Sequence, residues 1–140
     1  MDEYNLTRFI EAQEGVYPTA LKEVREGYKR SHWMWFIFPQ LRGLGHSYYA
    51  NFYGISGAEE AKAYLSDPIL GPRLRKISEA LLELETDDAR EVFGGIDSAK
   101  LRSSMTLFDA VEPDSVFARV LDKYFNGQRD NRTIKILLSS

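Results

Sequence analysis

The chain has 140 residues, 44% of them hydrophobic, and it carries 18 Lys and Arg against 21 Asp and Glu, a formal charge of -3. This length and apolar content suit one domain with an ordinary core and exclude a disordered chain. The charge argues against a protein whose whole surface binds nucleic acid. Cysteine is absent, which excludes disulfides, thiolate nucleophiles and cysteine-bound zinc.

The chain also lacks sequence features of membrane and secreted proteins. No apolar run approaches the roughly 20 residues that cross a bilayer. The start of the chain is acidic and has neither the basic nor the apolar region of a signal peptide. We therefore expect a soluble, cytoplasmic protein with a single domain over residues 1–140.

Residues that begin and end helices recur along the chain, with apolar residues at spacings of three and four between them. In chain order, the predicted starts are Asn5, Pro18, Ser56 with Glu59 as a capping box, Pro72, Thr86 or Asp87, Asp97, Asp114 or Ser115, and Asp130. The predicted ends are Gly15, Gly27, Pro39, Gly94 with Gly95, Pro113, and Asn126 with Gly127.

One segment, residues 33–38, is a short apolar run that suits a buried strand or a buried helix. Its neighbours all have helical patterns and no partner strand is visible, so we predict a helix that Pro39 ends. The chain has no internal repeat and no hairpin signal between two alternating runs. The sequence therefore predicts an all-α fold, a compact single-domain bundle of about seven to nine short helices.

Residues 27–58 contain no Asp or Glu, although the composition of the chain predicts about 5 acids in a window of that length. The window also holds 9 of the 18 aromatic residues. Core packing explains the apolar rings on their own. The polar residues among them, which include Ser31, His32 and Gln40, need partners wherever they are buried, and a ligand is one such partner beside backbone and water.

The window suits an anion joined to a flat ring. Arg42 precedes Gly43 and Gly45 in a loop that leads to a predicted helix, and glycine N–H groups, a helix N-terminus and an arginine fork all favour an anion. The spacing of the two glycines is a weak motif, because it lacks the third glycine of the dinucleotide fingerprint and the ending of a P-loop. A plain turn explains it equally well. Rings that could stack on a ligand are Trp33, Trp35 and Tyr48.

The two histidines, His32 and His46, raise the question of catalysis or metal binding. They lie on different elements with no acid between them, which is no metal-ligand pattern, and we predict neither a metal nor a cofactor. Histidine can serve as a general acid or base near neutral pH, so His32 is the candidate catalytic residue. A histidine that is satisfied in the core, or that orients a neighbouring hydroxyl, is the alternative.

A second polar patch lies at residues 100–108. On a helix, Lys100, Ser103 and Ser104 share a face, and adjacent serines are not favoured in helices. Either the hydroxyls donate to carbonyls four residues earlier, or together with Thr106 they contact a phosphate or a ribose. Asp130 could join such a site, although an N-cap is its expected role.

These stretches resemble the uncharacterised, mainly bacterial family known as domain of unknown function 1810. The matching segments are residues 8–13, 29–40, 44–47, 100–108 and 127–130, and the run at 31–40 is highly specific. The resemblance implies an all-α fold and brings no established activity. Some relatives are labelled calpastatin, a disordered and repeat-bearing inhibitor that this aromatic domain does not resemble, so we reject that label.

The leading hypothesis is a site that binds, and could process, an anionic ligand with an aromatic or heteroaromatic group, such as a nucleotide or an ADP-ribose-like compound. The alternatives are a protein-interaction module with a basic aromatic patch and a non-catalytic structural domain. Stacking on single-stranded RNA is a third option, although acidic residues elsewhere disfavour an extended nucleic-acid track. Residues expected to contact the ligand are Lys29, Ser31, Trp33, Trp35, Gln40, Arg42, Gly43, Gly45, Ser47, Tyr48, Lys100, Ser103, Ser104 and Thr106.

Overall fold

The computed structural model describes residues 2–139, and within them it confirms the all-α prediction, with nine helices and one isolated β-bridge between Leu41 and Ile55. The helices are α1 (Thr7–Gln13), α2 (Tyr17–Glu26), α3 (Met34–Ile37), α4 (Tyr48–Phe52), α5 (Ala58–Ser66), α6 (Leu70–Leu82), α7 (Ala89–Val111), α8 (Val116–Phe125) and α9 (Asn131–Leu138). Over the same residues, no helix is both long and apolar enough to span a bilayer.

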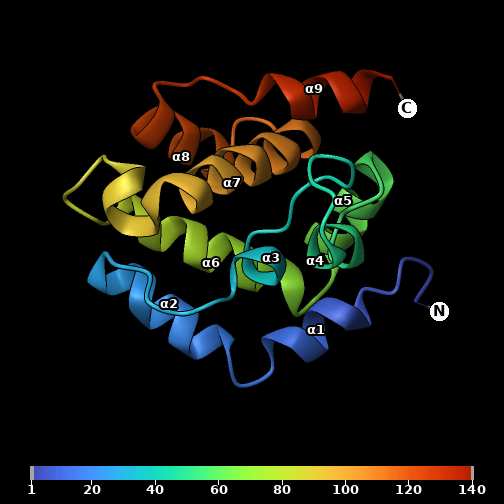
Figure 1. Cartoon of the computed structure of the whole chain (residues 1–140), viewed down its shortest axis with the longest axis horizontal. Helices are drawn as coiled ribbons and strands as arrows, with labels where there is room; N and C mark the ends of the chain where they lie inside the picture. Colours follow the sequence, from blue (N-terminus) through green and yellow to red (C-terminus); the bar gives the residue numbers. More distant parts are fainter. Residues whose placement is uncertain (1, 140) are drawn as a thin grey trace.

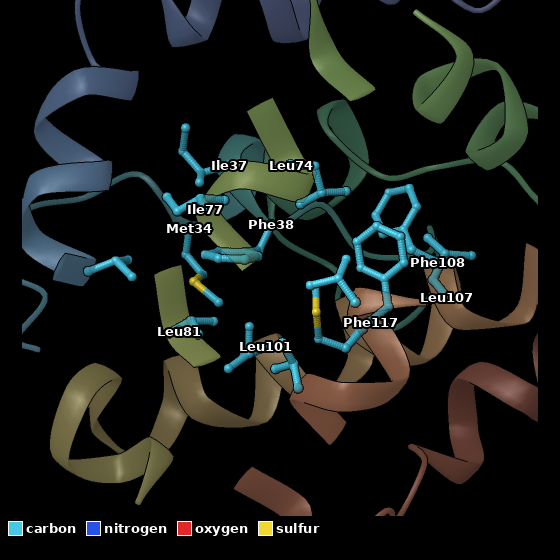
Figure 2. Close-up of a cluster of buried hydrophobic side chains, with 14 of the residues drawn as sticks. Met34, Ile37, Phe38, Leu74, Ile77, Leu81, Leu101, Leu107, Phe108 and Phe117 are labelled. Atoms are coloured by element: carbon cyan, nitrogen blue, oxygen red, sulfur yellow. The ribbon is translucent and has the colours of Figure 1, made fainter. Parts of the chain in front are cut away.

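The helix α6 lies in the middle of the bundle. It packs against α2 on one side and against α8 on the other, while α7 contacts α5, α8 and α9 (Figure 1). Leu74, Ile77 and Leu81, at spacings of three and four, form its buried apolar stripe, and burial of each such side chain stabilises the fold by about 1.5–3 kcal/mol. Figure 2 shows this stripe in one cluster with Met34, Ile37, Phe38, Leu101 and Phe117.

Several helix boundaries are as predicted, because short-range geometry sets them. Pro18 lies in the first turn of α2, and Gly27 ends that helix in the left-handed conformation with φ 79°. The apolar run at 33–38 forms the one-turn helix α3. Asn126 ends α8 with φ 54°, and the carboxylate of Asp130 caps α9.

Other predicted starts are wrong because carboxylates from nearby residues satisfy the first N–H groups instead. Asn5 has φ 55° and does not cap α1; the Asp2 carboxylate accepts from the backbone N–H groups of Leu6 and Thr7, at 2.6 and 2.9 Å. Likewise α6 begins at Leu70 rather than Pro72, since the Asp67 carboxylate accepts from the N–H groups of residues 69 and 70.

The helix α5 shows a similar displacement. The predicted box of Ser56 with Glu59 does not form, and Gly57 is the N-cap residue. Glu60 takes the role of Glu59, and its carboxylate accepts from the backbone N–H of Ser56 at 2.9 Å. The other oxygen of the Glu60 carboxylate accepts from the guanidinium of Arg8, which is buried and fixes the position of Glu60.

The segment predicted as two helices over residues 87–111 is the element α7, in which two helical stretches meet at a break. Asp88 caps it, in place of Thr86 or Asp87, by accepting from the N–H of Arg90. Gly94 has φ 81° and ψ 170°, a non-helical conformation that ends the first stretch where the glycine stop was predicted. Asp97 therefore does not cap a new helix, and its carboxylate lies against lysine side chains.

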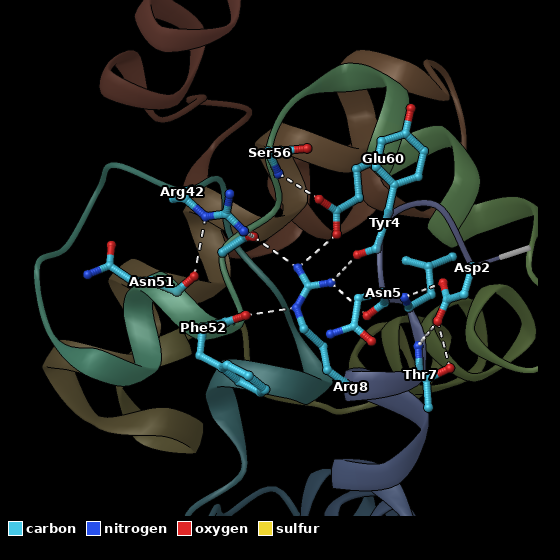
Figure 3. Close-up of polar contacts among 12 residues, drawn as sticks. Asp2, Tyr4, Asn5, Thr7, Arg8, Arg42, Asn51, Phe52, Ser56 and Glu60 are labelled. Carbon is cyan, nitrogen blue, oxygen red and sulfur yellow. Dashed lines mark hydrogen bonds and ion pairs between the residues drawn. The ribbon is translucent and has the colours of Figure 1, made fainter.

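One buried ion pair joins α1 to the middle of the chain (Figure 3). Arg8 Nη2 lies 2.8 Å from Glu60 Oε2, and the two side chains are only 5% and 2% exposed. The remaining donors of the guanidinium bind backbone carbonyls of Tyr4, Asn5, Phe52 and Gly54. All five N–H donors that an arginine offers are thus satisfied, and the backbone at the end of α4 is held against α1.

We expect Arg8→Met to lower the free energy of unfolding by about 3–5 kcal/mol, because the Glu60 carboxylate would stay buried without its partner. Urea denaturation followed by circular dichroism measures the change. Arg30→Met is the matched control, since Arg30 forms an exposed ion pair with Glu26 and should cost about 1 kcal/mol or less. Equal losses in the two variants would contradict a structural role for the buried pair.

Candidate functional site

The structure brings the two polar segments together. A hollow of about 520 Å³ opens between the chain around α3 and the middle of α7. We call it the aromatic hollow. His32, Trp33 and Trp35 line it from the first segment, and Asp97 and Lys100 line it from the second. Further rings in its wall are Phe36, Tyr49 and Tyr53.

A second hollow, of about 430 Å³, adjoins the first. We call it the cationic hollow, because Lys100, Arg102 and Arg132 outnumber its one acid, Asp130. Other polar groups and loop residues of its wall are Gln40, Gly45 and Ser103. Trp35 and Lys100 line both hollows, so the two meet at this pair of side chains.

A carboxylate links the cations at this meeting point. Asp97 Oδ2 lies 2.9 Å from Lys29 Nζ, and Asp97 Oδ1 lies 3.3 Å from Lys100 Nζ. Each ammonium also lies over an indole ring, with Lys29 4.9 Å from the centroid of Trp33 and Lys100 4.0 Å from that of Trp35. Cation–π contacts of this kind stabilise by about 0.5–2 kcal/mol each. We refer to the three charged residues as the lysine–aspartate bridge, and their sum is one positive charge.

The loop that carries Trp33 is organised by Glu23 of α2, which is buried. Its carboxylate accepts from the indole N–H of Trp33 at 2.9 Å, from the hydroxyl and N–H of Ser31, and from the N–H of Arg30. Burial raises the pKa of this carboxyl, but the hydrogen bonds from Ser31, Arg30 and Trp33 outweigh burial and lower the pKa to about 2. Ser31 is thus engaged with Glu23 and does not line a hollow.

The loop predicted to hold an anion is occupied with its own structure. The guanidinium of Arg42 donates to the carbonyls of Asn51 and Gly54, at 3.2 and 2.9 Å (Figure 3). Gly43 packs near the side chain of Ile136, and Ser47 caps α4. These residues, and the exposed His46, lie outside both hollows; Gly45 alone of the loop's predicted residues lines one.

The polar face of α7 is divided between fold and site. The Ser103 hydroxyl lies 3.2 Å from both the Ala99 carbonyl and the Asp130 carboxylate, at the wall of the cationic hollow. The Thr106 hydroxyl donates to the carbonyl of Arg102 and accepts from the Asp130 N–H, which fixes the start of α9. Ser104 is fully buried and its hydroxyl has no partner among the described residues, so it is not placed to meet a ligand.

Two of the predicted site residues, His32 and Tyr48, have exposed side chains. His32 lines the aromatic hollow. Tyr48, predicted to stack on the ligand, lies outside both hollows; it is 71% exposed and stacks on Phe52 instead. No group of His, Asp and Glu within residues 2–139 is arranged to hold a metal ion.

Sequence reasoning missed several contributors to this region. Tyr49 and Tyr53 lie within residues 27–58, but nothing in the sequence distinguishes them from aromatic residues of the core. Arg132 reaches the cationic hollow from α9, and its guanidinium donates to the carbonyl of Leu44 at 3.1 Å. Asp97 carried a usable signal, because it lies three residues before Lys100 and so on the same helical face.

The comparisons with known proteins give a family and a structural relative. A family model described as "Protein of unknown function (DUF1810)" matches residues 3–137. The crystal structure of the conserved hypothetical protein Rv1873 from Mycobacterium tuberculosis is similar, with a TM-score of 0.93 and 46% identity over 99% of this chain and 100% of that one. No curated protein matches the chain.

We expect Glu23→Gln to lower the free energy of unfolding by about 1–3 kcal/mol at pH 7, because an amide cannot accept from all the donors around it. The carboxyl has a lower pKa in the folded chain, about 2 against 4.5. Its stabilisation is therefore complete above about pH 4.5 and is lost as the pH falls toward 2. Urea denaturation between pH 7 and 3 should show the variant approaching the parent protein.

Glu26→Gln is the control for this experiment, since Glu26 lies one turn away and its ion pair with Arg30 is exposed. The control should keep the parent's pH dependence below pH 4.5. A Glu23→Gln variant with that same dependence would show that the Glu23 carboxylate does not stabilise the fold.

Proposed function

The chain belongs to the DUF1810 family of proteins of unknown function, and we propose that this member binds a small anionic ligand that carries an aromatic or heteroaromatic ring. The observation that carries the proposal is the meeting of an aromatic hollow and a cationic hollow at Trp35 and Lys100. Each hollow is within the range of about 300–1,000 Å³ typical of small-molecule sites.

The aromatic hollow suits a flat ring. Trp33 is buried beneath it and held by Glu23, whereas Trp35 is only half-buried. Phe36 and Tyr53 pack against each other in the wall, with ring centroids 5.4 Å apart. Stacking of a nucleobase on an aromatic side chain is worth about 1–3 kcal/mol.

The cationic hollow suits a phosphate or another small anion. Arg102 and Arg132 donate two and one of their five N–H groups to backbone carbonyls, so both keep donors for an anion, as does Lys100. The side-chain amide of Gln40 also lines this hollow and can add a neutral donor. Charge-assisted hydrogen bonds from such groups are about twice as strong as neutral ones.

Lys29, expected to contact the ligand, lines the aromatic hollow. Its ammonium forms an ion pair with Asp97, donates to the carbonyl of Ser31 at 2.6 Å and lies over the face of Trp33. It therefore positions the tryptophan and the carboxylate, and Lys100 is the member of the bridge that faces both hollows. In the proposed site, Lys100 contacts the anion while its stem covers Trp35.

Binding can be followed through the protein's own fluorescence, because its two tryptophans, Trp33 and Trp35, both line the aromatic hollow. Titration with nucleotides, sugar phosphates and sugar-free aromatic acids should give saturable quenching for at least one compound. At 100 times its Kd, that compound should also stabilise the chain by about 2.7 kcal/mol in thermal unfolding. Lys100→Met should weaken its binding about tenfold or more, through the loss of a charge-assisted hydrogen bond.

Lys62→Met is the matched control, since Lys62 is an exposed lysine of α5 away from both hollows. It should leave the Kd unchanged. The proposal fails when none of these compounds changes the fluorescence or the unfolding temperature. It also fails when a compound binds the parent and Lys100→Met equally well.

A reaction at this site would need a general acid or base, and His32 is the candidate for that role, because it is exposed and lines the aromatic hollow. With a binder in hand, hydrolysis of its glycosidic or phosphoester bond can be followed by chromatography. His32→Ala should reduce the rate by about 10²–10⁴-fold while changing the Kd little. An unchanged rate in His32→Ala would exclude this residue as the acid or base.

A further inference from the structure

We infer that the carboxylate of Asp97 accepts hydrogen bonds from the hydroxyl groups of a ribose, so that the ligand is a ribonucleotide. This inference rests on the proposed function and makes its ligand class specific. Among the described lining residues of the aromatic hollow, which are mostly rings and cations, Asp97 alone is acidic.

The position of Asp97 matches the middle of such a ligand. Its carboxylate lies between the two lysines and lines the aromatic hollow, while Lys100, one of its partners, lines both hollows. The carboxylate therefore lies in the hollow that holds the rings and pairs with the lysine that lines both hollows. A ribose that joins a base among the rings to a phosphate beside Lys100 would pass this carboxylate.

The chemistry of the carboxylate fits hydroxyl donors. Ionised carboxylates accept only, and their two oxygens offer about four acceptor positions. The ion pairs with Lys29 and Lys100 hold both oxygens of Asp97, which remains 19% exposed toward the hollow. A pair of neighbouring hydroxyls can donate to the positions that are left, as ribose hydroxyls do to an acidic residue in dinucleotide-binding folds.

The charges of the two hollows favour one orientation of the ligand. A phosphate in the aromatic hollow would meet the lysine–aspartate bridge, whose sum is one positive charge, whereas a phosphate in the cationic hollow would meet three cations and one acid. The larger positive charge of the cationic hollow therefore favours the orientation with the base among the rings. If Asp97 served only to pair with the two lysines, binding would not depend on the hydroxyl groups of the ligand. A preference for ligands with ribose hydroxyls therefore distinguishes recognition by Asp97 from a purely structural role.

The test is a fluorescence titration with adenosine and uridine 5′-monophosphates, each beside its 2′,3′-dideoxy counterpart. Loss of hydrogen bonds to a charged acceptor should weaken binding of the dideoxy compound about tenfold or more. This ratio is measured on the parent chain and does not depend on how well any variant folds. Equal binding of the two forms would overturn the inference and leave the proposed function standing.

Asp97→Asn should reduce the ratio to about threefold or less, because an amide presents fewer acceptor positions. Asp109→Asn is the matched control, since Asp109 lies on the same helix and pairs with Arg129 away from both hollows; it should keep the parent's ratio. An Asp97→Asn variant that keeps the parent's preference for the ribonucleotide over its dideoxy counterpart would overturn the inference. Binding of a sugar-free aromatic acid with no binding of ribonucleotides would overturn it alone, whereas no binding by any compound would overturn the proposed function as well.

Discussion

The site depends on one buried carboxylate that lies outside it. Glu23 is surrounded by protein, so its charge needs donors, and the chain supplies them from the loop that follows Gly27. The path of that loop is therefore set, and with it the plane of Trp33. The ring then supports the ammonium of Lys29, which in turn holds Asp97. A helix that contributes no side chain to either hollow thus determines how the hollows are lined.

The fold was predictable where short-range chemistry decides it. Proline in a first turn, glycine in the left-handed conformation and the spacing of Leu74, Ile77 and Leu81 all act within a few residues, and the structure agrees with them. Helix starts were less predictable, because a carboxylate can reach an N–H from several positions. Glu60 illustrates this, since its partnership with Arg8, more than fifty residues away, decides which acid meets the start of α5.

The composition of the site was harder to predict than the fold. Residues 27–58 contain no acid, but acids from other helices contact them in the folded chain: Glu23 of α2 and Asp97 of α7. Conversely, the guanidinium of Arg42 donates to backbone carbonyls, and the hydroxyl of Thr106 bonds to backbone groups of α7 and of the start of α9. Residue type and local spacing identified the two segments that meet, whereas partners far apart in the sequence decided which side chains remain available there.

The interruption of α7 at Gly94 has a geometric consequence. An unbroken α-helix carries each side chain about 100° around its axis from the one before, so the azimuth of every residue is fixed by its neighbours. At φ 81° and ψ 170° this progression is reset. The turn before the break presents the Val92 carbonyl to the backbone of Lys29, and the turns after it present Asp97 to that lysine's side chain. Gly94 has no Cβ and can adopt this conformation. Its break changes the direction in which the following side chains point, so that both halves of α7 contact Lys29.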